Sequence, residues 1–127
     1  MKTALLLIAH GSREPDANAD LHHVVEQLRQ FHRHDLVEAC FLELTPPDID
    51  AGASRCVEGG ADCIILLPYF LSAGVHVRRD LTAACQRLAE RWPQIQFGLA
   101  EPLGRHPLLI EVLLERARQA NSGEPEA

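Results

Sequence analysis

The chain has 127 residues, of which 46% are apolar and 24% charged, and its formal net charge is −6. This length predicts one domain that buries about two-thirds of its unfolded surface, and the acidic balance argues against a nucleic-acid-binding scaffold. Lys2 is the only lysine, which excludes a Walker A lysine, a kinase lysine and an internal Schiff-base lysine.

The apolar runs and the cysteines indicate where the protein resides. No apolar run approaches the roughly 20 residues that a membrane span needs, and the apolar start lacks a signal-peptide cleavage pattern. We therefore expect a soluble cytoplasmic protein with neither a membrane nor a nucleic-acid partner. The cysteines form no CxxC pair, so we interpret them as small apolar side chains in a reducing compartment. They are Cys40, Cys56, Cys63 and Cys85.

The first half of the chain predicts two strand–helix units. Residues 3–9 and 36–42 are short apolar runs, which are typical of strands buried on both faces. A helical pattern follows the first run, over residues 16–34. After the second run, Thr45 is the expected N-cap and Pro46 the expected first residue of a helix that ends at Glu58, before Gly59 and Gly60.

The second half repeats this alternation. Residues 62–67 predict a third strand and residues 77–91 a third helix, which Trp92 and Pro93 end. Residues 95–100 predict a fourth strand, and a last helix follows Pro107 as far as Ala120. We expect the polar tail, residues 121–127, to be disordered.

Together these elements predict one α/β domain over residues 1–120. It is an open parallel sheet of four strands with helices on both faces and right-handed crossovers. We choose the flavodoxin-like strand order 2-1-3-4, in which the first and third strands are neighbours. Ligands of such sheets bind at the carboxyl ends of the strands, so residues that follow strands are the candidate site.

Three potential metal ligands follow three of the predicted strands. His10 follows the first strand, Glu43 the second, and His76 lies at the end of the loop after the third. The predicted topology puts them on one rim, where two imidazoles and a carboxylate would form a metal site with open positions. Each residue alone also has an ordinary interpretation. His10 could be a solvent-facing histidine in a turn, Glu43 a carboxylate that solvates a strand end, and His76 a histidine at a helix N-terminus.

Other residues near the strand ends are weaker candidates. Gly11 is expected to let the backbone approach a ligand closely. Arginines near the strand ends are candidates for binding an acidic small molecule, which the net negative charge of the chain would otherwise repel, namely Arg13, Arg78, Arg79 and Arg105. The remaining histidines are expected to lie on the surface of the first helix or at a helix start, namely His22, His23, His32, His34 and His106.

Four motifs in matching order and spacing carry a resemblance to a known family. They are Ala9-His10-Gly11-Ser12-Arg13, FLELTPPDI at 41–49, LPYFLSAGVHVRRD at 67–80, and LGRHP at 103–107. From Leu5 to about Leu114 the chain resembles the short CbiX type of class II chelatase. This type belongs with the sirohydrochlorin cobaltochelatases and ferrochelatases, which include SirB.

The resemblance implies roles for particular residues. It implies that His10 is a metal ligand and the catalytic proton acceptor, that His76 is the second metal ligand, and that Glu43 contacts substrate or metal. The loop that would line the tetrapyrrole consists of Leu71, Ser72, Ala73, Gly74, Val75 and His76.

The resemblance also implies an activity, which is ATP-independent insertion of a divalent metal into sirohydrochlorin on the route to cobalamin or sirohaem. Cobalt is the expected metal, with iron or nickel as alternatives, and no cofactor is expected beyond this substrate metal. Because larger members look like two such units fused, we expect a homodimer whose interface borders the His10/His76 crevice. Two other functions stay open: a metal- or tetrapyrrole-binding chaperone without turnover, and a metal-dependent hydrolase built on the same His/His/Glu rim.

Overall fold

Four strands form the centre of the molecule. The computed structural model describes residues 1–122, and its strands are β1 (Thr3–Ala9), β2 (Leu36–Phe41), β3 (Cys63–Pro68) and β4 (Gln96–Leu99). They alternate with the helices α1 (Pro15–Phe31), α2 (Ile49–Glu58), α3 (Val75–Arg91) and α4 (Pro107–Ser122). The alternation of strands and helices predicted from the sequence is confirmed.

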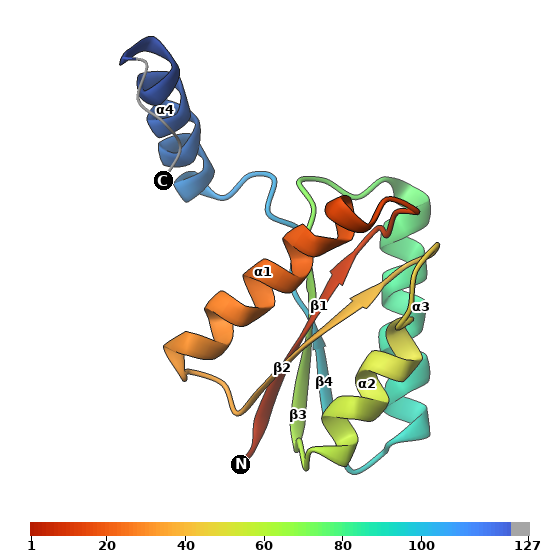
Figure 1. The fold of residues 1–127 in the computed structure, drawn as a ribbon. Coiled ribbons are helices and arrows are strands. Elements are labelled where there is room, and N and C mark those ends of the chain that lie inside the picture. The colour runs from red at the N-terminus through yellow and green to blue at the C-terminus, as the bar shows by residue number, and fades with distance from the viewer. Residues whose placement is uncertain (123–127) are drawn as a thin grey trace.

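All neighbouring strands are parallel, in the order β2-β1-β3-β4 (Figure 1). The predicted fold class and strand order are therefore confirmed. β1 lies between β2 and β3, and its residues Ala4–Ile8 are all buried. This burial explains why its sequence is continuously apolar instead of alternating with polar residues.

The two faces of the sheet have separate apolar cores. On one face, Leu81 of α3 and residues of α2 pack against Leu6 of β1 and Ile64 of β3. On the other face, Leu21 of α1 packs with Leu5 of β1. Figure 1 shows the same layers, with α1 on one side of the sheet and α2 and α3 on the other. The strands thus present one common edge, their carboxyl ends, for a site.

Several element ends differ from the prediction. α1 ends at Phe31 instead of His34, because His32 takes a left-handed φ of 54° and its N–H donates to the Arg29 carbonyl. α3 begins at Val75 with Gly74 as its N-cap, two residues earlier than predicted, so His76 is helical. β4 is shorter than the predicted strand 95–100 and covers only Gln96–Leu99.

The start of α2 was predicted wrongly. Its N-cap is Asp48, whose carboxylate accepts a hydrogen bond of 2.8 Å from the Ala51 N–H, and not Thr45. Pro46 cannot begin the helix because a residue that precedes another proline is disfavoured in the α region. The segment instead lies against the end of β2, where the Phe41 N–H donates to the Pro47 carbonyl at 2.9 Å.

The last helix stands apart from the other elements. α4 projects away from the sheet (Figure 1), and none of its residues through Asn121 is buried. Asn121 and Ser122, predicted to begin a disordered tail, are part of α4. The rest of that predicted tail, 123–127, lies outside the described residues. None of the helices in the described part of the chain combines the length and apolarity that a membrane crossing requires.

Candidate functional site

His10 and Glu43 are held side by side at the carboxyl edge of the sheet. The hydrogen bonding between β1 and β2 continues beyond the strand ends, where the Leu42 N–H donates to the Ala9 carbonyl at 2.9 Å. Next to it, the Glu43 N–H donates to the His10 carbonyl at 3.1 Å. Two residues that lie 33 positions apart in the sequence are thereby fixed as neighbours, as their positions after neighbouring strands predicted.

Gly11 makes this close approach possible. Its φ of +94° lies in the region that favours glycine, and a Cβ at this position would overlap the carbonyl oxygen of Glu43. The sequence predicted that Gly11 lets the backbone approach a ligand. The structure shows a close approach to the Glu43 backbone, so the glycine sets the spacing of the two candidate residues.

The His10 ring is oriented by an aromatic neighbour. Phe70, in the loop after β3, lies with its ring centroid 4.5 Å from that of His10 at an interplanar angle of 32°. The loop is tied to β1 because the Tyr69 N–H donates to the Ile8 carbonyl at 2.7 Å. Among the described residues, none hydrogen-bonds to the His10 ring nitrogens. The exposed imidazole is therefore available to bind a metal or to accept a proton.

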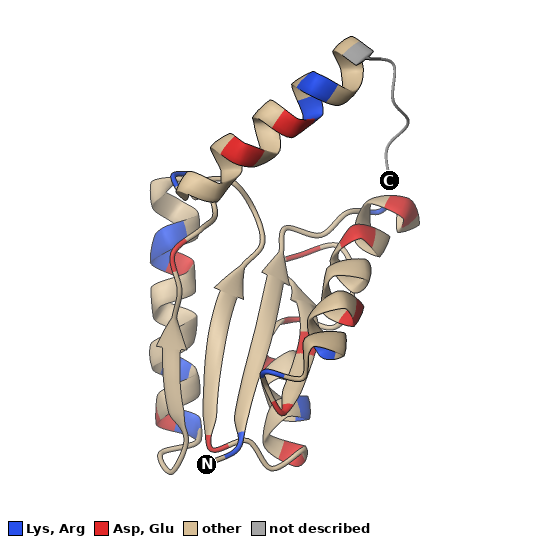
Figure 2. Cartoon of the chain, turned by 90° about the vertical axis from the view of Figure 1, so that its left-hand side faces the viewer, with Lys and Arg blue, Asp and Glu red and all other residues tan. Residues whose placement is uncertain are grey.

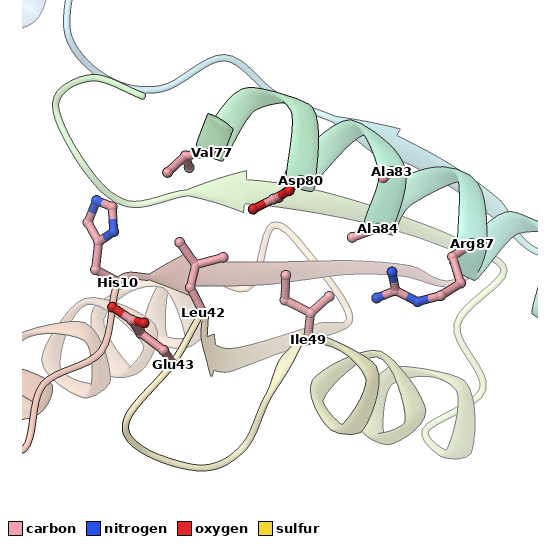
Figure 3. A pocket seen from close by; sticks show the side chains of 9 residues that line it. All are labelled: His10, Leu42, Glu43, Ile49, Val77, Asp80, Ala83, Ala84 and Arg87. Atoms are coloured by element: carbon pink, nitrogen blue, oxygen red, sulfur yellow. The ribbon is translucent and has the colours of Figure 1, made fainter. Parts of the chain in front are cut away.

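A cleft of about 430 Å³ opens between this edge and α3. Figure 3 shows His10 and Glu43 at one end, Arg87 at the other, and Asp80 of α3 on the wall between them. The lining residues are His10, Leu42, Glu43, Ile49, Val77, Asp80, Ala83, Ala84 and Arg87. An imidazole and two carboxylates above an apolar floor can attract a divalent cation and take up protons.

Arg87 does not offer a free positive charge to this cleft. Its guanidinium pairs with Asp50 of α2, with Nη2 3.1 Å from one carboxylate oxygen and Nε 3.4 Å from the other. This fork-like pair joins α3 to α2 and neutralises the arginine. Among the residues that the structure describes, His10, Glu43 and Asp80 are therefore the ionisable groups of the cleft that form no ion pair.

His76 lies outside the lining of this cleft. It is exposed in the first turn of α3, four residues before Asp80 and seven before Ala83, so it belongs to the same side of the helix, one turn nearer its start. Within residues 1–122 no three His, Cys, Asp or Glu side chains are gathered closely enough to hold a metal ion. The predicted trio shares one rim, but the described chain does not pre-assemble it as a closed metal site.

The predicted substrate loop borders a second cleft, of about 800 Å³. It is lined by Leu71, Ser72, Arg78, Glu101, Pro102, Gly104, Arg105 and His106. Arg78 donates through Nε to the Ala73 carbonyl at 3.2 Å and through Nη1 to Glu101 at 3.4 Å. Arg78 and Arg105 thus lie beside the predicted loop, whereas the exposed Arg13 and Arg79 line neither cleft.

Two residues of the site, Asp80 and Phe70, were not predicted from the sequence as metal, substrate or catalytic residues. Asp80 stands four residues after His76, and this spacing is the one signal that places it on the same side of a helix. Phe70 is adjacent to the predicted substrate loop, but its contact with His10 depends on β3 lying beside β1.

The remaining histidines and the cysteines take little part in the site. His22, His23 and His32 are exposed and His34 is half-buried, while the Nδ1 of His106 accepts a hydrogen bond from the Leu108 N–H at the start of α4. Cys40 and Cys56 are buried, and Cys63 and Cys85 are half-buried. Burial raises the pKa of Cys56 to about 12 and also raises the pKa of the Cys40 and Cys85 thiols. Neutral thiols are poor metal ligands.

Comparison with known proteins gives consistent matches. The CbiX family model matches residues 4–120. The sirohydrochlorin cobaltochelatase of Priestia megaterium is 37% identical over 122 residues, which are 96% of this chain and 40% of that protein. The sirohydrochlorin cobaltochelatase of Sulfolobus acidocaldarius is 36% identical over 121 residues, 94% of each chain.

A solved structure shares the fold. The sirohydrochlorin chelatase SirB from Bacillus subtilis subspecies spizizenii, in complex with cobalt, has a TM-score of 0.85 and 29% identity. The match covers 94% of this chain and 51% of that one. This chain therefore spans less than half of the Priestia protein and about half of SirB, but nearly the whole Sulfolobus relative. Because the CbiX family model matches residues 4–120 of this chain and the chain shares its fold with SirB, the chain belongs to the CbiX family.

Proposed function

We propose that this protein inserts a divalent metal ion, with cobalt as the first choice and iron or nickel as alternatives, into sirohydrochlorin without ATP. The observation that carries the proposal is the pairing of His10 and Glu43 at the sheet edge, held by backbone hydrogen bonds in a cleft that Asp80 also lines. Relatives of the same family are named sirohydrochlorin cobaltochelatases.

The reaction exchanges two pyrrole N–H protons for one divalent metal ion, so the protein must deliver the metal and accept the protons. His10 is the proposed proton acceptor and first metal ligand, because a neutral imidazole performs both tasks near neutral pH. His76 is the proposed second metal ligand, and Glu43 contacts the metal or the macrocycle. A site that must release its metal to the substrate benefits from open coordination positions, which two or three protein ligands leave.

We propose that the macrocycle lies against residues 71–75. Arg78 is the first candidate to bind its carboxylates, and Arg13 and Arg79 are further candidates. Arg78 supports this role best, since it lines the cleft beside Leu71 and Ser72 and its partner Glu101 is mostly exposed. An exposed ion pair of this kind contributes little stability and is readily exchanged for a substrate carboxylate. The protein works in the cytoplasm with no cofactor besides the substrate metal, in the route to cobalamin or sirohaem.

We further propose that two chains form a homodimer with their rims facing each other. Adjacent strands are about 4.8 Å apart, so a four-stranded edge spans only about 15 Å and covers one side of a tetrapyrrole. Leu71 and Val75 are exposed beside the rim, where pairing would bury them. Two facing rims would also shield the macrocycle from water.

Substitution of the proposed ligands tests the activity. His10→Ala and His76→Ala are each expected to abolish cobalt insertion, followed by the absorbance change of the tetrapyrrole, while both leave the circular dichroism spectrum intact because the side chains are exposed. His23→Ala, another exposed histidine with no role in the site, is the matched control. Glu43→Gln should slow insertion strongly but retain metal binding, since both imidazoles remain. Near-normal turnover in both ligand variants would contradict the assignment.

The same assay separates the other two functions. A chaperone would change the absorbance only stoichiometrically with protein, whereas a chelatase acts over many turnovers. A hydrolase would instead release product from phosphoester or amide substrates in the presence of the metal alone.

A further inference from the structure

Asp80 of α3 lines the cleft that holds His10 and Glu43, yet the proposed reaction assigns it no task. Figure 3 shows its carboxylate on the α3 wall of the cleft, between His10 at one end and Arg87 at the other. Over residues 1–122, no side chain or backbone group forms a hydrogen bond or an ion pair with this carboxylate. Asp80 is therefore a charged group at the cleft that is available to a ligand of opposite charge.

The strands of the sheet contribute almost no charge to the cleft. Among the described strands Glu38 is the only charged residue, and Arg29 pairs with its carboxylate at 3.3 Å. Figure 2 shows the same distribution, with the charged residues on helices and loops and the strands almost free of them. The electrostatic potential of the cleft is therefore set by side chains at its rim and on α3.

The side chains that line the cleft leave it with a net negative charge. Glu43 and Asp80 each carry one negative charge, and the imidazole of His10 is neutral in its metal-binding form. Arg87 also lines the cleft, but Asp50 of α2 holds its guanidinium at 3.1 Å. Because this ion pair has no net charge, Glu43 and Asp80 attract a divalent cation without an opposing charge from Arg87.

Asp80 and the His10–Glu43 pair do not hold one ion together in this structure. Within residues 1–122 no three His, Cys, Asp or Glu side chains lie close enough to share a metal. His76 precedes Asp80 by four residues on α3, a spacing at which the Cβ atoms of helical residues lie about 5–6 Å apart. An imidazole and a carboxylate at this separation can hold a hydrated Co²⁺ ion between them. The rim therefore offers a metal ion two successive positions, first at Asp80 and then at His10 and Glu43.

We propose that Asp80 is the docking residue for the incoming metal: with His76 it holds a hydrated divalent ion, which then passes to His10 and Glu43. This inference rests on the metal insertion proposed above and adds the residue that admits the metal. During the transfer the imidazole of His10 replaces the carboxylate of Asp80 as a ligand, and no proton moves. His76, the proposed second ligand of the bound metal, accompanies the ion. A single exposed carboxylate suits this step, because it attracts the ion but binds it weakly enough to release it.

Removal of the Asp80 charge tests docking within the insertion reaction. Asp80→Asn keeps the size of the side chain and should raise the KM for Co²⁺ about tenfold, while the rate at saturating Co²⁺ stays near that of the wild type. The KM for the tetrapyrrole should not change. Glu90→Gln is the matched control, because Glu90 is an exposed carboxylate of α3 that lines neither cleft. An unchanged KM for Co²⁺ in Asp80→Asn, or the same rise in both variants, would overturn the proposal.

The ion pair between Arg87 and Asp50 provides a second test, which leaves Asp80 in place. Asp50→Asn removes the carboxylate that holds Arg87, so a free positive charge remains in the cleft and should raise the KM for Co²⁺. Adding Arg87→Gln removes that charge and should lower the KM again. Circular dichroism checks that both variants keep the fold, which is expected because a partly exposed ion pair contributes little stability. A KM that does not respond to the freed arginine would contradict charge-guided docking.

Metal binding without tetrapyrrole separates docking from the proposed activity. In His10→Ala, which lacks the proposed final ligand, Co²⁺ should still bind at Asp80 and His76, as measured by calorimetry. Adding Asp80→Asn should weaken this binding about tenfold, whereas adding Glu90→Gln should not. Equal affinities in the two double variants, or no Co²⁺ binding by His10→Ala, would refute docking and leave the proposed insertion standing. Conversely, a wild type that inserts no metal, with double variants that differ as expected, would refute the activity and leave the docking pair standing.

Discussion

At the scale of single residues, the site depends on a glycine that touches no ligand. Gly11 has a positive φ, and its lack of a side chain leaves room for the Glu43 carbonyl. Replacement by alanine forces both an unfavourable backbone conformation and a steric overlap. We expect Gly11→Ala to lower the free energy of unfolding by at least about 2 kcal/mol and to reduce insertion by moving His10 away from Glu43.

Urea unfolding and the insertion assay measure these two effects. The control is Gly98→Ala, where φ is not positive and a Cβ meets no neighbour, so its unfolding free energy should change by less than about 0.5 kcal/mol. If Gly11→Ala and Gly98→Ala had the same free energy of unfolding, the backbone at Gly11 would accommodate a Cβ without loss of stability, which would contradict the prediction.

Single residues also show what the sequence could and could not predict about the site. His10, Glu43 and His76 were predicted to share one rim because each follows a strand, and parallel strands end at one edge. The crevice that His10 and His76 were expected to flank is instead lined by His10 and Glu43, without His76. Asp80 and the ring contact of Phe70 were not predicted, because both depend on side chains that meet across elements far apart in the sequence. Gly11 was correctly predicted to allow a close backbone approach, but the approaching group is the Glu43 carbonyl and not a ligand. No local sequence pattern reveals which group approaches a glycine.

At the scale of elements, helix starts were the least predictable feature. Thr45 and Pro46 have the residue types of an N-cap and a first turn, yet the helix begins at Ile49. The segment before Asp48 forms a turn instead of a helix. In this turn the Thr45 N–H donates to the Glu43 carbonyl at 2.9 Å, and Leu44 between them has a φ of 69°. A local preference for helix was overridden by the turn that positions Glu43.

The cap of α2 gives a prediction at this scale. Asp48→Ala removes the acceptor for the Ala51 N–H and should lower the free energy of unfolding by about 1 kcal/mol. Asp48→Asn keeps a side-chain oxygen at the same position and should stay near the wild type. Chemical denaturation of the three proteins compares them directly, and equal losses in both variants would assign the effect to charge and not to the hydrogen bond.

At the scale of the whole molecule, the strand order was predictable and the position of α4 was not. The right-handedness of crossovers and the four repeated units leave few topologies for a chain of this length, and the predicted order is the observed one. The helical pattern after Pro107 correctly predicted α4. Its apolar pattern, however, indicates only that one side of the helix packs against another surface, and not where that surface lies.

The proposed pairing of rims makes activity depend on protein concentration. If two chains are needed to enclose one macrocycle, dilution well below the dissociation constant leaves a dimer concentration that falls with the square of the chain concentration. Each further tenfold dilution should then lower the activity per chain about tenfold. Insertion rates measured over a dilution series, with carrier protein present to prevent loss on surfaces, check this directly.

A tandem fusion of two chains provides the control, because its second unit is present at a high effective concentration at any dilution. Its linker must be long enough to let both rims meet, which requires a flexible segment such as a glycine–serine repeat. The fusion should keep its activity per unit where the single chain loses it, and a His10→Ala change in both units should abolish it. Constant activity per chain in the unfused protein, at concentrations where light scattering finds only monomers, would mean that one rim is sufficient for insertion.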